Sequence, residues 1–205
     1  MLKLFGTRES GHAYKVRLFL KLAGITHRYE PVDISVPREQ RPESFRELAK
    51  FGEVPVLVDD GQVLVQSNAI LLHLAAKTGH FGWKTDAGRD DVTSWLFWEA
   101  NRIGRSYPNL RWFRLFQQGD AGLVRWLEQT GRDDMARLDQ ELAQKPFLTG
   151  AFSIADISCA GYLLYGDKIG LDTDEYPHIA TWLDRIRALP GWQHPYRLLT
   201  EAENA

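Results

Sequence analysis

The stretch from Gly52 to Ser67 constrains this chain most, because it reads as a strand, a tight turn, a second strand and a helix start. Residues 56–58 and 63–65 are apolar and mostly β-branched, and Asp60-Gly61 between them is typical of a two-residue hairpin turn. Pro55 opens the first strand, where its missing N–H costs no ladder hydrogen bond and a cis bond would turn the chain. The sequence therefore predicts a hairpin entered through a proline.

Both ends of this hairpin offer backbone groups to a ligand. At its entry the backbone of Val54 is left available. At its exit Gln66 and Ser67 precede the apolar run 68–74, and we expect Ser67 to cap that helix. Because free N–H groups converge at a helix start, the exit predicts an anion-sized site.

Composition excludes several classes of protein. A chain of 205 residues with 44% hydrophobic residues buries a sizeable core, and a net charge of −2 gives no field for nucleic acid. No stretch approaches the roughly 20 apolar residues of a membrane span, and the N-terminus lacks a signal-peptide run, so we expect a cytoplasmic protein without a membrane partner. The single cysteine, Cys159, excludes an internal disulfide and a cysteine-based zinc site, and we expect no metal.

The first part of the chain alternates strands and helices. We expect a strand at 3–5, a helix opened by Ser10 and closed by Gly24, a strand at 29–34 and a short helix at 44–49. Together with the hairpin and its helix, these elements give the order β-α-β-α-β-β-α, with a right-handed crossover. This order is typical of a thioredoxin-like domain, which we predict for residues 1–77.

The rest of the chain is patterned as helices. Residues 78–88 are glycine-rich and predict a linker, and 89–205 predict an all-helical domain. The expected helices lie at 89–116 with an interruption at Pro108, at 122–143, at 153–169 closed by Gly170, and at 177–189. Ser153 and Asp156 form the pattern of a capping box at the start of the third helix.

The order of these motifs resembles the glutathione transferases, and the resemblance covers nearly the whole chain. It is carried by Val54-Pro55 before the hairpin, by Gln66-Ser67 after it, and by Thr149-Gly150 followed by Ser-Ile-Ala-Asp-Ile from Ser153. The resemblance implies a thioredoxin-like α/β domain followed by an all-α domain. It also implies that the Val54 backbone pairs with the cysteinyl part of glutathione, after a cis-proline, while Gln66 and Ser67 take the γ-glutamyl carboxylate.

Glutathione transfer needs a donor that holds the bound thiol as a thiolate, because the thiolate is the nucleophile. In the family this donor follows the first strand, and Ser10-Gly11-His12 occupies that place. Ser10 is the first candidate and Thr7 in the same loop is the alternative. His12 stands where a Thr-Pro-Asn-like tripeptide has Asn, and we expect it to contribute to glutathione binding. The match is to a bacterial-type serine or Thr-Pro-Asn-like subclass, with the choice left open.

Two further groups of residues follow from the resemblance. Glu53 cannot pair with an anion, so the candidates for the glycyl carboxylate are Lys50 and, on the long helix, Arg102 and Arg105. The electrophile would lie over Trp98, Arg102, Tyr107 and Trp112, where Arg102, Arg105, Arg111 and Arg114 form a loose basic series unlike core.

The resulting hypothesis is a cytosolic, homodimeric glutathione transferase that takes part in detoxification. Glutathione would be the co-substrate, and its thiolate would attack a small electrophile or a peroxide. The alternative is a transferase-like module that binds glutathione with little or no catalysis.

Overall fold

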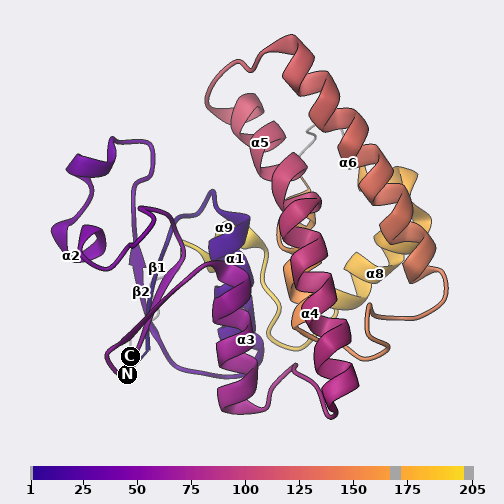
Figure 1. Ribbon diagram of the computed structural model, residues 1–205, viewed down its shortest axis with the longest axis horizontal. Coiled ribbons are helices and arrows are strands. Elements are labelled where there is room, and N and C mark those ends of the chain that lie inside the picture. The colour runs from indigo at the N-terminus through magenta and orange to yellow at the C-terminus, as the bar shows by residue number, and fades with distance from the viewer. Residues whose placement is uncertain (1, 167–171, 201–205) are drawn as a thin grey trace. The chain divides into compact units, whose positions relative to one another are not determined.

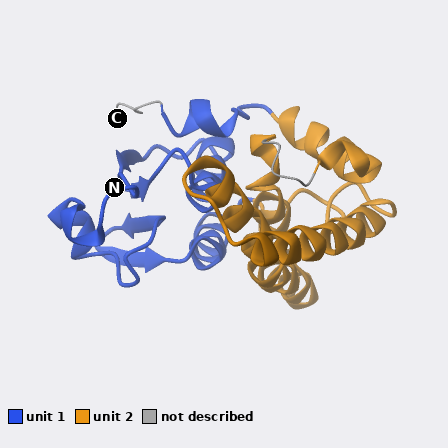
Figure 2. Ribbon diagram, turned by 90° about the horizontal axis from the view of Figure 1, so that it is seen from above, with its two compact units in different colours: residues 1–80, 190–205 blue, residues 81–189 orange. Residues whose placement is uncertain are grey.

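The computed structural model describes residues 2–166 and 172–200. The chain folds into two compact units, residues 1–80 with 190–205 (unit 1) and residues 81–189 (unit 2), coloured separately in Figure 2. Unit 1 holds the sheet, and unit 2 is helical. None of the helices within the described ranges is long and apolar enough to cross a membrane.

Unit 1 is built on a four-stranded sheet in the order β2-β1-β3-β4. Strand β1 is parallel to β2 and antiparallel to β3, and β3 and β4 form the hairpin. The strands are β1 (Lys3–Gly6), β2 (Arg28–Pro31), β3 (Val56–Asp59) and β4 (Gln62–Val65). The helices are α1 (Gly11–Leu22), a short 3₁₀ helix η1 (Arg38–Gln40), α2 (Glu43–Arg46), α3 (Ser67–Thr78) and α9 (Pro195–Leu198). This β-α-β-α-β-β-α order confirms the predicted thioredoxin-like domain.

The two faces of the sheet are covered by different helices. Figure 1 shows α1 and α3 on one face and α2 on the other. Phe5 and Val56 are register partners, so their side chains share the face on which Phe45 of α2 completes a buried cluster. Leu4 and Leu57, one position along each strand, point to the opposite face and are fully buried. The alternation explains why the sheet needs a helix on each side.

The end of the chain packs with unit 1. The Tyr14 hydroxyl of α1 donates to the Gln193 carbonyl at 2.9 Å, and α9 packs against α1. The sequence predicts one helical domain from residue 89 to 205, whereas the stretch from Pro190 onwards groups with unit 1.

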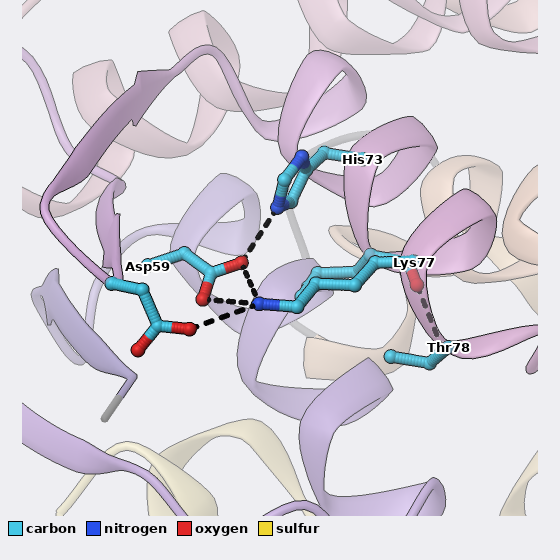
Figure 3. Close-up of polar contacts among 6 residues, drawn as sticks. Asp59, His73, Lys77 and Thr78 are labelled. Carbon is cyan, nitrogen blue, oxygen red and sulfur yellow. Dashed lines mark hydrogen bonds and ion pairs between the residues drawn. The ribbon is translucent and has the colours of Figure 1, made fainter.

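The hairpin has the predicted turn. Asp60 and Gly61 both have positive φ, at 48° and 89°, the pattern that matches the right-handed twist of paired strands. At the end of β3, Asp59 accepts hydrogen bonds from His73 Nε2 at 2.7 Å and from Lys77 Nζ at 2.6 Å (Figure 3). Both partners lie on α3, so this carboxylate ties the hairpin to the helix that follows it.

Unit 2 consists of helices α4 (Asp86–Asn101), α5 (Ile103–Leu115), α6 (Ala121–Leu142), α7 (Ile154–Ala160) and α8 (Pro177–Arg187), with short 3₁₀ turns η2 (Leu163–Tyr165) and η3 (Thr173–Glu175). The predicted interruption at Pro108 is wrong in position. The break lies at Arg102 (φ −119°, ψ −94°), and Pro108 sits inside α5. Because α5 begins at Ile103, Pro108 lies in its second turn. The only helical hydrogen bond that is lost there is the one from residue 108 to the Gly104 carbonyl.

Helix α7 begins with the predicted capping box. The Ser153 hydroxyl accepts from the Ala155 N–H, and Asp156 Oδ2 accepts from the Ser153 N–H at 2.9 Å. The other oxygen of Asp156 accepts from the Leu148 N–H and from Trp182 Nε1, both at 2.9 Å. The helix is shorter than predicted because it ends at Ala160; the predicted closing residue Gly170 lies outside the described residues.

Candidate functional site

The sheet register brings the predicted ligand-binding segments to one edge. Phe5 is opposite Val56, and Val56 is opposite Val65. The loop that follows β1, the residues that precede β3 and those that follow β4 therefore leave the sheet at the same end. These segments are 7–10, 54–55 and 66–67, the stretches that sequence analysis predicts to hold glutathione.

The peptide bond between Val54 and Pro55 is cis, as predicted. Pro55 is buried beside the strand it opens, and Val54 is half-buried. Arg41 holds the preceding loop, because its guanidinium donates to the carbonyls of Gly52 at 2.8 Å and of Ile34 at 3.2 Å. Sequence reasoning did not single out Arg41, whose role depends on carbonyls distant along the chain.

Ser10 is the N-cap of α1, as predicted. Its Oγ accepts from the Ala13 N–H at 3.2 Å, its own N–H donates to the Thr7 carbonyl at 3.1 Å, and its residue is only 6% exposed. A hydroxyl is one donor and two acceptors, so capping leaves its proton for another partner. Thr7, the alternative candidate, is also buried and lies in the same loop.

His12 lies in the first turn of α1 and is half-buried. Its Nδ1 is 3.4 Å from the Nζ of Lys15, which follows three residues later on the same helix. His12 and Ser10 therefore flank the same helix start, the region of partial positive charge that an anion prefers.

The turn from β4 into α3 corrects the predicted cap. Gln66 is the N-cap, with a positive φ of 69°, and Ser67 is the first helical residue and is buried. A single residue has to turn the chain from strand to helix, because β4 ends at Val65, and Gln66 does so in the left-handed region. The Gln66 amide donates to Glu53 Oε2 at 3.1 Å, so Glu53 orients Gln66.

A surface cavity of about 950 Å³ opens beside Gln66. Its lining includes Lys50, the candidate for the glycyl carboxylate, and two arginines that sequence reasoning missed, Arg38 and Arg46. Gly52 lies against Arg38, since a Cβ there would be 3.0 Å from the arginine Cδ. Within the described ranges no ion pair involves Arg38 or Lys50, although Glu39 and Glu53 also line the cavity.

The predicted electrophile residues lie in unit 2 in different environments. Trp98 packs edge-on against Trp95 at 5.3 Å, and Trp112 packs against Phe116 at 4.5 Å. Tyr107 is buried, and burial raises the pKa of its hydroxyl.

Arg102 remains accessible at the break between α4 and α5. Its guanidinium is about half exposed and lies 3.8 Å from Asp134, whose carboxylate is buried. Burial raises the pKa of Asp134, although Arg102 and Arg105 oppose this rise.

The basic series is not uniform, which corrects one prediction. Arg111 is only 3% exposed, and its guanidinium lies 4.1 Å from the Tyr165 ring centroid. A guanidinium is planar and weakly hydrated, so it can stack on an aromatic ring inside a helical core. Arg111 therefore belongs to the core, whereas Arg114 is accessible and pairs with Glu128 at 3.7 Å.

The thiol and metal chemistry of the described residues is limited. Cys159 is a free, fully buried cysteine in α7. No group of three or more His, Cys, Asp and Glu side chains in the described part of the chain could hold a metal ion.

The polar groups at the sheet edge, and the cations of the cavity, are suited to bind an anionic organic molecule.

Comparison with known families matches both parts of the chain. Residues 10–77 match the family model "Glutathione S-transferase, N-terminal domain", and residues 125–185 match "Glutathione S-transferase, C-terminal domain". The first match spans the sheet-edge segments from Ser10 to Ser67.

Individual relatives and solved structures agree with these matches. The disulfide-bond oxidoreductase YfcG of Escherichia coli is 30% identical over 91% of this chain and 90% of its own length. A crystal structure of a glutathione S-transferase from Pseudomonas fluorescens is 30% identical, with a TM-score of 0.84 over 95% of this chain and 98% of that one. A theta class enzyme from Xanthomonas axonopodis pv. citri, solved with glutathione bound, shares the fold at 24% identity with a TM-score of 0.84, over 99% of each chain.

Proposed function

Since this chain belongs to the glutathione S-transferase family, we propose that it binds glutathione at the sheet edge and transfers its thiolate to a small electrophile or a peroxide. The observation that carries the proposal is the convergence of Ser10, the cis Val54-Pro55 peptide and Gln66-Ser67 on one end of the sheet. Each segment offers a different kind of group, which suits a ligand with several polar parts.

The γ-glutamyl end of glutathione carries a carboxylate and an ammonium group. The start of α3 supplies N–H donors and the Ser67 hydroxyl to the carboxylate, and the helix dipole favours its charge. The Glu53 carboxylate, held next to Gln66, suits the ammonium group. This pairing gives Glu53 a role in place of the glycyl contact that its charge forbids.

The middle and the far end of glutathione find separate partners. The Val54 backbone pairs with the cysteinyl part. The cavity beside Gln66 takes the glycyl carboxylate, with Lys50 and Arg38 as its cationic partners. No ion pair within the described ranges neutralises Lys50 or Arg38, so both cations can pair with the glycyl carboxylate even though Glu39 and Glu53 line the same cavity.

Ser10 supplies the hydrogen bond that holds the thiolate. A hydrogen bond to a charged group contributes about 1.5–3 kcal/mol, and one pKa unit corresponds to about 1.4 kcal/mol. One donor therefore lowers the pKa of the bound thiol by about one to two units, enough to increase the thiolate fraction strongly at neutral pH. Thr7 is the alternative donor.

The second substrate binds over unit 2, where Trp98, Tyr107 and Trp112 supply aromatic surface and Arg102 supplies charge. The accessible guanidinium of Arg102 favours anionic or polarised electrophiles. Because Asp134 pairs with Arg102 only at 3.8 Å, the arginine keeps capacity for a substrate group.

The relative YfcG is a disulfide-bond oxidoreductase, and this chain suits such chemistry only through glutathione itself. Cys159 is fully buried, so it cannot act as an exchanging thiol. A disulfide substrate would have to be attacked by the bound glutathione thiolate. The remaining alternative is a module that binds glutathione without turnover.

Calorimetric titration with glutathione, followed by turnover on chlorodinitrobenzene, cumene hydroperoxide, a haloalkane and a mixed disulfide, tests the proposal. Binding together with turnover on any of these substrates supports a glutathione-dependent enzyme, and the active substrate gives its class. Binding without turnover supports the module instead. No binding at millimolar glutathione contradicts both.

We further propose that the protein is a cytoplasmic homodimer with a role in detoxification.

A further inference from the structure

The contact between His12 and Lys15 restricts which nitrogen of the His12 imidazole can carry a hydrogen. Lys15 lies in α1, three residues after His12, and its side chain is 0% exposed. Its Nζ lies 3.4 Å from the Nδ1 atom of the imidazole. A lysine ammonium group has three donors and no acceptor, so the imidazole nitrogen facing it has to be an acceptor. A protonated imidazole has a hydrogen on both nitrogens and cannot accept.

We propose that Lys15 is a positioning residue that fixes His12 as the neutral tautomer with its hydrogen on Nε2. Nδ1 carries the lone pair that accepts from Lys15, and Nε2–H is a donor. The inference rests on the proposed function in one respect only, namely that the acceptor served by this donor is the thiolate of bound glutathione.

The fixed tautomer decides whether His12 supports or opposes a thiolate. With its hydrogen on Nε2, the imidazole is a hydrogen-bond donor at the start of α1, in addition to the Ser10 hydroxyl. In the opposite tautomer Nε2 would carry a lone pair, and it would repel a thiolate placed near it. A buried lysine at this position therefore selects one of the two neutral tautomers of His12, the one in which Nε2 is a donor.

His27 supplies an internal reference of the opposite kind. Its Nδ1 lies 3.0 Å from the carbonyl oxygen of Ile25, and a carbonyl only accepts. Nδ1 of His27 therefore carries a hydrogen. The two histidines lie in the same unit, so one spectrum of one protein compares both tautomers.

The first experiment reads the tautomer directly. The full chain is labelled with ¹⁵N-histidine, and long-range ¹H–¹⁵N correlations identify the protonated nitrogen of each imidazole. The chain has six histidines, which single His→Gln variants assign. We expect His12 to have an unprotonated Nδ1 and a protonated Nε2, and His27 to have a protonated Nδ1. A His12 ring protonated at Nδ1 would overturn the proposal.

A matched pair of variants then tests the role of Lys15. Lys15→Met keeps the length and apolar stem of the side chain but removes the donor, whereas Lys21→Met makes the same change in the last turn of α1. We expect Lys15→Met to give mixed tautomers at His12 while His27 stays unchanged, and Lys21→Met to leave both as in the parent. An unchanged His12 tautomer in folded Lys15→Met refutes the positioning role. If Lys15→Met does not fold, the His12 tautomer in the parent spectrum is the test, and a hydrogen on Nδ1 refutes the proposal.

The second experiment tests the donor through isosteric amides. The amide nitrogen of glutamine overlays Nε2 of histidine, and that of asparagine overlays Nδ1. We expect His12→Gln to keep the thiolate absorbance of bound glutathione. In His12→Ala and His12→Asn, the affinity for the thiolate form of glutathione should fall about tenfold, which corresponds to the loss of one donor worth about 1.4 kcal/mol.

An equal thiolate titration in all three variants refutes the donor role. If the parent protein binds no glutathione, the proposed function fails, while the tautomer experiment still decides whether Lys15 sets the state of His12.

Discussion

At the scale of single residues, the hydroxyl of Ser10 has to serve two partners. It accepts from the Ala13 N–H and therefore caps α1, and it retains one proton. The capping bond orients the hydroxyl before any ligand arrives, which lowers the entropy cost of donating to a thiolate. Capping and donation are thus compatible, and the two effects of a substitution have to be measured separately.

We expect Ser10→Ala to bind glutathione but to ionise it poorly. The loss of one hydrogen bond to a charged sulfur raises the pKa of the bound thiol by about one to two units, and the rate at neutral pH falls by about 10- to 100-fold. Higher pH restores part of the rate. Loss of the cap costs a further 1 kcal/mol or so of stability. Thiolate absorbance and melting curves separate the two effects, and Thr7→Ala is the matched comparison. A thiolate titration that shifts only in Thr7→Ala transfers the role to Thr7.

The contribution of Arg38 can be tested by changing the ligand together with the protein. γ-Glutamylcysteine is glutathione without its glycine, so it lacks the carboxylate that we assign to Arg38 and Lys50. We expect Arg38→Ala to raise the dissociation constant for glutathione about two- to fivefold, since an exposed ion pair contributes about 0.5–1 kcal/mol.

The same substitution should leave the dissociation constant for γ-glutamylcysteine unchanged. Arg28→Ala, which removes an exposed arginine of β2 outside the cavity, is the control and should change neither constant. Equal losses for both ligands in Arg38→Ala would show that Arg38 supports the loop rather than the glycyl carboxylate.

At the scale of secondary-structure elements, the Asp59 cluster joins β3 to α3. Burial alone would raise the pKa of Asp59, but the hydrogen bonds from His73 and Lys77 outweigh it and lower the pKa. A lowered pKa in the folded state means that the ionised carboxylate stabilises the fold above the unfolded pKa of about 3.9. This stability is lost as the pH falls through the folded pKa.

We therefore expect Asp59→Asn to lower the free energy of unfolding at neutral pH by about 1–2 kcal/mol, the value of a hydrogen bond to a charged group. The difference between variant and parent should shrink as the pH falls below about 4. Denaturant unfolding at a series of pH values measures it. Asp60→Asn, which changes the exposed neighbour, should have little effect. A constant difference at all pH values would show that the loss comes from packing and not from charge.

The capping box of α7 predicts unequal effects of its two residues. Ser153 contributes chiefly a cap, so Ser153→Ala should cost about 1 kcal/mol. Asp156 accepts from the Leu148 and Ser153 N–H groups and from the Trp182 indole. Asp156→Ala leaves these buried donors unsatisfied and should cost about 3 kcal/mol or more. Turnover per folded molecule should stay normal in Ser153→Ala, and a selective loss of turnover at unchanged melting temperature would contradict a purely structural role.

Elements with a local cause could be predicted from the sequence. Asp60-Gly61 sets its own turn, Ser10 caps the helix next to it, and the Ser153–Asp156 box acts across a single turn. Two features were predicted wrongly. The helix break lies at Arg102 instead of Pro108, and Arg111 is buried because Tyr165 lies against it. Neither effect leaves a pattern in a single sequence.

The candidate site divides in the same way. The position of Val54, Pro55, Gln66 and Ser67 at one end of the sheet could be predicted because the hairpin itself fixes the strand register. Arg38 and Arg41 could not, since one depends on the space left by Gly52 and the other on carbonyls of three separate residues. Basic side chains in a loop have no periodicity that marks them as part of a cavity.

At the scale of the whole molecule, exposed aromatic side chains bear on the proposed homodimer. Phe97 in α4 is 68% exposed, and no aromatic or cation–π contact of its ring occurs within the described part of the chain. Trp126 in α6 is also exposed, at 48%, but the Arg105 guanidinium covers its ring at 4.9 Å. Phe97 therefore gains more from burial against a second copy of the chain than Trp126 does.

We expect the parent protein to sediment with twice the chain mass of 23.5 kDa and Phe97→Ser to shift toward the monomer. Full burial of a phenylalanine contributes about 1.5–3 kcal/mol, and a symmetric interface buries two copies of it, so the dimer dissociation constant should rise at least about 100-fold. Trp126→Ser, which also removes an exposed aromatic ring of unit 2, should leave the dimer intact. Analytical ultracentrifugation over a range of concentrations measures both variants. A monomeric parent at micromolar concentration refutes the homodimer, and dissociation by Trp126→Ser alone would move the interface to α6.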